Sequence, residues 1–62
     1  MIYAFYFKSR AHHADKSTWG KERMPHDWTE REVAKAARLA GMEGYAVMNV
    51  STGKIHCFKW FV

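Results

Sequence analysis

The sequence predicts an α+β fold of chain order β-α-β-β, in which a three-stranded antiparallel sheet carries one helix on one face. Three patterns lead to this prediction: aromatic residues concentrated at both ends, one well-capped helix, and one hairpin turn. Seven of the ten aromatic residues lie near the termini, namely Tyr3, Phe5, Tyr6, Phe7, Phe58, Trp60 and Phe61. Because so much ring surface is stable only when buried, both ends of the chain are expected to be strands of one sheet.

The first strand is predicted over residues 2–8, which alternate as a strand should. Residues 9–27 have no apolar period and contain Gly20 and Pro25, so they are predicted to form a loop. A loop of that length in a small domain is usually functional.

The helix is predicted over residues 29–41. Thr29 and Glu32 have the spacing of a capping box, and Trp28 and Val33 have that of a hydrophobic staple. Gly41 ends the helix.

Two further strands are predicted over residues 45–50 and 54–61, joined by a turn in which Gly53 is left-handed. A right-handed crossover makes the strands at 2–8 and 45–50 parallel. The strand at 54–61 then lies between them, antiparallel to both, which gives the spatial order 1-3-2. All 62 residues are assigned to this one domain.

Side-chain volume predicts which face of the sheet the helix covers. The bulkier set should lie under the alanine-rich helix: Phe5, Phe7, Met48, Val50, Phe58 and Trp60. The opposite face would carry Tyr6, Lys8, Tyr45, Val47, Asn49, Ile55, Cys57, Lys59 and Phe61. This half-apolar face should be covered by the loop at 9–27, by a second subunit or by a ligand.

Composition narrows the function classes. A single cysteine excludes an internal disulfide and fits a reducing cytoplasm. The apolar run at 2–7 is too short for a membrane span or a signal sequence, so no membrane partner is expected. The neighbours His12 and His13 rarely bind one ion together, and His56 and Cys57 alternate across a strand, so no metal site is predicted. No catalytic motif or cofactor motif is present, and the chain is not expected to be an enzyme.

The net charge of +4 favours an anionic partner, either nucleic acid or an acidic protein surface. We expect a small non-enzymatic basic binding module, with single-stranded nucleic acid as the favoured ligand. The candidate binding residues come from the basic loop and the tyrosine-lysine face: Tyr6, Lys8, Arg10, Lys16, Trp19, Lys21, Arg23, Tyr45 and Lys59. A secondary basic stripe, Arg31, Lys35 and Arg38, follows the outer side of the helix, where like charges at this spacing are mildly unfavourable.

The alternative is a small protein-binding inhibitor or adaptor of the mobile-element, phage-like type, which would act by occluding a host protein surface. The long loop with Trp19 supports it equally. For self-association, the uncovered face predicts either a weak homodimer or a monomer with the loop draped over the sheet.

Overall fold

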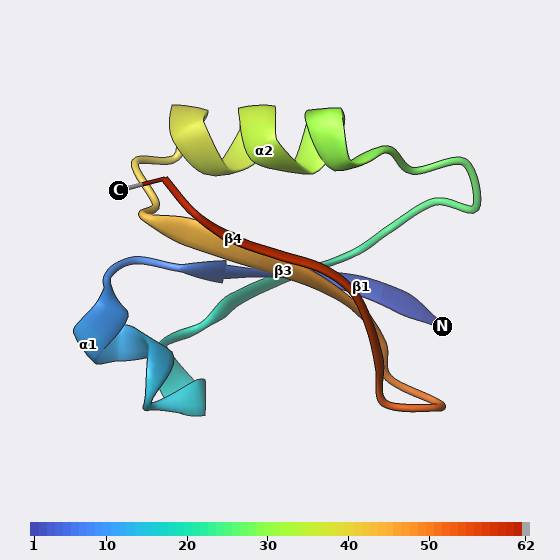
Figure 1. Cartoon of the computed structure of the whole chain (residues 1–62), viewed down its shortest axis with the longest axis horizontal. Coiled ribbons are helices and arrows are strands. Elements are labelled where there is room, and N and C mark those ends of the chain that lie inside the picture. The colour runs from blue at the N-terminus through green and yellow to red at the C-terminus, as the bar shows by residue number, and fades with distance from the viewer. Residues whose placement is uncertain (62) are drawn as a thin grey trace.

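Four antiparallel strands and one main helix make up the fold in the computed structural model, which describes residues 1–61. The elements in chain order are β1 (Ile2–Phe7), α1 (Arg10–His13), the 3-10 turn η1 (Lys16–Thr18), β2 (Gly20–Arg23), α2 (Glu30–Leu39), β3 (Gly44–Asn49) and β4 (Lys54–Trp60). Helix α2 lies over one face of the sheet, and α1 with η1 lies against the other (Figure 1). The α+β class and the antiparallel sheet with one main helix are confirmed.

The predicted strand count and strand order are wrong. The sheet has four strands in the order β2-β1-β3-β4, so β3, not β4, lies beside β1. Because β1 is antiparallel to both neighbours, β2 and β3 run parallel to each other on either side of it. Helix α2 connects this parallel pair. The prediction that the strands at 2–8 and 45–50 run parallel is therefore wrong, because β1 and β3 are antiparallel neighbours and the parallel pair that α2 joins begins at β2.

Strand β2 was not predicted from the sequence because its residues show no apolar alternation. It is a short edge strand, and what alternates along it is charge. Lys21 and Arg23 pair with Phe5 and Tyr3 of β1, whereas Glu22 pairs with Ala4 and lies on the other face. The segment at 9–27, predicted as one loop, therefore contains α1, η1 and a strand.

The caps of α2 follow the predicted chemistry closely. The Thr29 hydroxyl oxygen accepts a hydrogen bond from the Glu32 amide at 3.3 Å. The same hydroxyl donates a 3.1 Å hydrogen bond to the Glu32 carboxylate. In a capping box the Thr29 amide would be the donor to this carboxylate. At the other end Gly41 has φ 73°, and the amides of Gly41 and Met42 donate to the carbonyls of Arg38 and Ala37. These paired bonds form a Schellman motif, which ends the helix where the sequence predicts.

The predicted choice of face is also wrong. Helix α2 covers the face that carries Ala4, Tyr45 and Val47, all of which are buried against Val33 and Ala37. The small side chain of Ala4 leaves space for the helix, and the Tyr45 hydroxyl reaches Glu30 at the border, where it donates a 2.6 Å hydrogen bond. A tyrosine ring can be buried there because its hydroxyl has a hydrogen-bond partner. Side-chain volume alone therefore does not show which face of the sheet the helix covers.

A bulge in β4 moves one apolar residue to the opposite face. Val47 pairs with Cys57 and Met48 pairs with Ile55, so His56 is the extra residue. Strict alternation would place Ile55 on the same face as Cys57, as predicted. The bulge instead puts Ile55 beside Met48, on the face away from α2, and leaves the His56 ring 5.8 Å from Trp28.

Candidate functional site

The sheet face away from α2 carries two rows of directly paired side chains that run across all four strands. The first row is Arg23, Tyr3, Met48 and Ile55, and the second row is Lys21, Phe5, Ala46 and Phe58. We call these eight residues the open face. Each row begins with a cation on β2, has an aromatic ring on β1, and ends in an apolar side chain on β4. Among them Ile55 is 58% and Phe58 42% exposed, so much of this apolar surface faces solvent.

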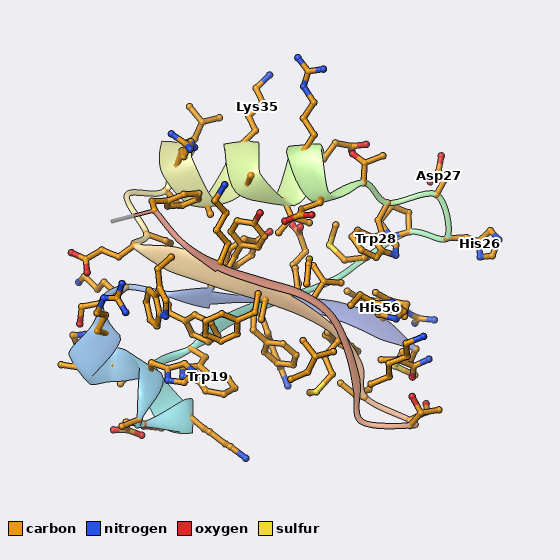
Figure 2. The ribbon with its side chains drawn as sticks, in the orientation of Figure 1. Trp19, His26, Asp27, Trp28, Lys35 and His56 are labelled. Carbon is orange, nitrogen blue, oxygen red and sulfur yellow. The ribbon has the colours of Figure 1, made fainter. Side chains whose placement is uncertain are left out.

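The segment formed by α1 and η1 covers only one end of this sheet face. It holds Trp19 and His13 against Phe7, with ring centroids 4.9 and 4.8 Å apart, and leaves Phe7 only 1% exposed. The Trp19 indole N–H donates a 3.1 Å hydrogen bond to the His13 carbonyl and fixes its ring. Trp19 lies on the α1 side of the sheet, opposite α2 (Figure 2). A loop at 9–27 draped over the sheet is one of the two predicted alternatives, and the first half of this segment does cover sheet residues, but on the face opposite to the one expected.

Gly44 allows the remaining ring to close this covered end. The Trp60 side chain lies directly on Gly44, and a Cβ at that position would overlap its ring and come within 2.9 Å of the Lys59 carbonyl oxygen. Only glycine fits under the ring. Trp60 also contacts the Phe7 ring at 5.6 Å, so the covered end is a packed aromatic cluster and the two rows remain accessible beside it.

A hollow of about 190 Å³ lies where the second row passes the covered end. Ala46 is its floor, because it is the small partner between Phe5 and Phe58. Trp19 and Lys16 contribute to its wall. The hollow is therefore lined by flat rings and bordered by a cation.

Within residues 1–61 the two cations of the open face, Lys21 and Arg23, form no ion pair. The Lys21 ammonium lies 5.8 Å from the Tyr3 ring centroid, close enough for a cation–π interaction. Glu22 lies on the opposite face, where it accepts a 3.4 Å hydrogen bond from Tyr6. Asp15 accepts two hydrogen bonds from Ser17, which lower the pKa of its carboxyl group.

The structure brings some of the predicted binding residues together and separates others. Lys16, Trp19, Lys21 and Arg23 lie on or beside the open face, and the Arg10 guanidinium lies 4.7 Å from the Trp60 ring centroid at its covered end. Four others do not join them. By strand alternation Tyr6, Tyr45 and Lys59 lie on the α2 side of the sheet. Lys8 follows the end of β1, and the cations Arg31, Lys35 and Arg38 line a trough on α2.

The two tyrosines of the predicted site serve the core. Tyr45 is only 2% exposed, and burial together with its hydrogen bond to Glu30 raises the pKa of its hydroxyl. Burial, aided by Glu22, also raises the pKa of the Tyr6 hydroxyl. Because α2 covers this face, the surface on which a homodimer was expected is already occupied within the chain.

Sequence reasoning missed the open-face rings as a binding surface. The prediction places Phe5 and Phe58 under the helix because they are large, and it names Tyr3 in no binding site. The available signal was the alternation in β2, where two cations flank one carboxylate. Once β2 is recognised, its cations must lie on the same face as Tyr3 and Phe5.

Comparisons with known proteins add no further assignment, since no family model, curated protein or solved structure matches this chain. Within residues 1–61, no three histidine, cysteine, aspartate or glutamate side chains converge as a metal site would require. No helix in that part of the chain is long and apolar enough to cross a membrane.

Proposed function

We propose that this chain is a small non-enzymatic module of the cytoplasm that binds single-stranded nucleic acid on its open face. One observation carries the proposal. The register of β2 places Lys21 and Arg23 beside Phe5 and Tyr3, on the sheet face that α2 does not cover. Aromatic rings next to a line of cations are what an unpaired strand needs, because bases stack on the rings and phosphates meet the charges.

The geometry favours unpaired bases over duplex. The Tyr3 and Phe5 rings are 6.3 Å apart and inclined by only 27°, so they form two neighbouring, nearly parallel platforms. Bases inside a duplex are stacked on each other and cannot reach such rings, whereas splayed bases can. Base–ring stacking contributes about 1–3 kcal/mol per base. Lys21, Arg23 and Lys16 would then hold the backbone along the β2 edge.

Fluorescence anisotropy with labelled single-stranded oligonucleotides, measured over a range of salt concentrations, tests this proposal. We expect Phe58→Ala to weaken binding by about 5- to 100-fold, because it removes one exposed stacking ring. Lys21→Gln should weaken binding and flatten the salt dependence by about 0.7 in the log–log slope, the value for one phosphate contact on a single strand. Lys59→Gln removes the same charge from the α2 side and should change neither quantity. Absence of binding by the wild-type protein at low salt would refute the proposal.

The β4 half of the open face favours a second candidate function. Met48, Ile55 and Phe58 line one side of the hollow, and none of them is charged. Such an area suits a protein partner, as an inhibitor or adaptor that occludes a host surface would need. A pulldown from nuclease-treated lysate separates the two functions. A stoichiometric protein partner that Ile55→Asp releases would favour this second function, and loss of all binding after nuclease treatment would favour the first.

A further inference from the structure

A second cationic surface lies on the side of the molecule opposite the open face. Arg31, Lys35 and Arg38 follow one another along the outside of α2, with Ala34 between them, and together they line a shallow trough. Lys35 points directly away from the sheet (Figure 2). We call Arg31, Lys35 and Arg38 the α2 stripe.

The charges of the α2 stripe are not balanced within the described chain. Glu30 and Glu32 lie on the same helix, where their carboxylates accept hydrogen bonds from the hydroxyl groups of Tyr45 and Thr29. Within residues 1–61 neither Arg31 nor Lys35 forms an ion pair. Like charges spaced by three or four residues on a helix repel one another. An external anion would relieve this repulsion.

The shape of the α2 stripe selects a linear polyanion. From Arg31 to Arg38 the stripe is about 10 Å long, from the rise of an α-helix. Its trough is shallow and open, with no enclosed cavity that could hold a small anion. The Arg38 guanidinium is held 4.5 Å from the Phe61 ring centroid, which fixes the end of the stripe. No aromatic ring lies among the trough residues to receive a base, and besides its three cations the trough is lined by the aliphatic side chains of Ala34 and Leu39. The charged contacts available there are to phosphates.

The two surfaces face opposite directions, because α2 lies on one side of the sheet and α1 with η1 lies on the other (Figure 1). From this arrangement we propose that one molecule holds two nucleic-acid segments at once, with unpaired bases on the open face and the phosphate backbone of a second segment on the α2 stripe. This inference rests on the proposed single-strand binding. Holding two strands together raises their local concentration, so the protein should promote the annealing of complementary strands.

The test measures the annealing rate of two complementary labelled oligonucleotides in the presence of the full-length protein. We expect the wild-type protein to accelerate annealing by about tenfold or more, with a maximum near one protein for every two strands. The rate should fall again at excess protein, because every strand then carries its own molecule and bridging is lost. A protein that only melts secondary structure would show no such maximum.

Variants of the α2 stripe separate bridging from binding. Arg31→Gln with Lys35→Gln should reduce the acceleration to within about twofold of the protein-free rate, since two phosphate contacts are lost. The same variant should bind a short single strand within about threefold of the wild type. The matched control, Lys8→Gln with Lys54→Gln, removes an equal charge outside both surfaces and should anneal strands normally.

Each other outcome overturns the inference in a distinguishable way. If the wild-type protein binds single strands but does not accelerate annealing, bridging is wrong and the proposed function stands. If it binds no oligonucleotide, the proposed function fails and bridging fails with it. If the Arg31→Gln, Lys35→Gln variant still accelerates annealing, the α2 stripe is not a phosphate site. The binding of a poly-glutamate peptide can be measured in parallel. If the variant loses only this peptide binding, the α2 stripe binds acidic side chains and not phosphates.

Discussion

The two faces of the sheet use the same kinds of residue for different purposes. On the α2 side, Tyr45 is 2% exposed, its hydroxyl is hydrogen bonded to Glu30, and the helix excludes water from its ring. On the open side, Tyr3 is half-buried beside Arg23 and within cation–π distance of Lys21. One tyrosine stabilises the fold, and the other presents a ring next to positive charge. Residue type alone does not distinguish them, but the strand pairing does.

The largest contrast is expected from making the same substitution on each face. Tyr45→Ala should destabilise the protein by about 3–5 kcal/mol, because it leaves a cavity under α2. A loss of that size equals much of the stability of a small domain, so the variant should be largely unfolded. Tyr3→Ala should cost about 1 kcal/mol and act mainly on binding. Urea denaturation followed by circular dichroism compares them, and equal losses would mean that Tyr3 belongs to the core.

A smaller effect is expected at two strand glycines. Gly44→Ala should cost about 1–3 kcal/mol, because the new methyl group overlaps the Trp60 ring and forces the covered end apart. Gly20→Ala is the matched control, since a Cβ there meets Tyr6 at an ordinary 3.7 Å. Thermal melting of both variants measures the difference. If Gly20→Ala proves as harmful as Gly44→Ala, the packing of Trp60 on Gly44 is not what stabilises that end.

The smallest effect is a pH dependence that belongs to the α2 face. Burial and Glu30 raise the pKa of Tyr45 above the ordinary tyrosine value of about 10. The folded state therefore holds this proton more tightly than the unfolded state does. The resulting stability is complete below about pH 10 and is lost as the pH rises above it. The urea concentration at the midpoint of unfolding should therefore fall as the pH rises above that value. It should fall less steeply in the Tyr45→Phe variant, which has no hydroxyl to titrate. A midpoint with the same alkaline slope in the variant would assign the effect elsewhere, with Tyr6 as the first alternative.

The sequence predicts the elements of this fold better than their arrangement. The capping residues Thr29 and Glu32 and the stop at Gly41 locate α2, because these signals act within a few residues of one another. Alternation locates β1, β3 and β4. The arrangement depends on β2, which is held by backbone pairing to β1 and carries no apolar pattern.

Missing β2 has consequences for the site as well. When β2 is not predicted, helix α2 is taken to connect β1 to β3, although it connects β2 to β3. Lys21 and Arg23 are then loop residues that are assigned to neither face of the sheet. The bulge at His56, which moves Ile55 to the open face, depends on long-range pairing and has no local signal. The cations of the site could therefore be predicted from the sequence, whereas their aromatic neighbours could not.

The most direct test of the central claim maps the ligand onto the two faces by NMR. ¹⁵N-labelled protein is titrated with less than one equivalent of a single-stranded oligonucleotide of about six nucleotides. Stacking makes the open face the tighter surface, so the first shifts should appear in β1, in β2 and in the Trp19 indole, while the amides of α2 stay unchanged. First shifts in α2, with β1 and β2 unchanged, would contradict the claim that the open face is the binding surface.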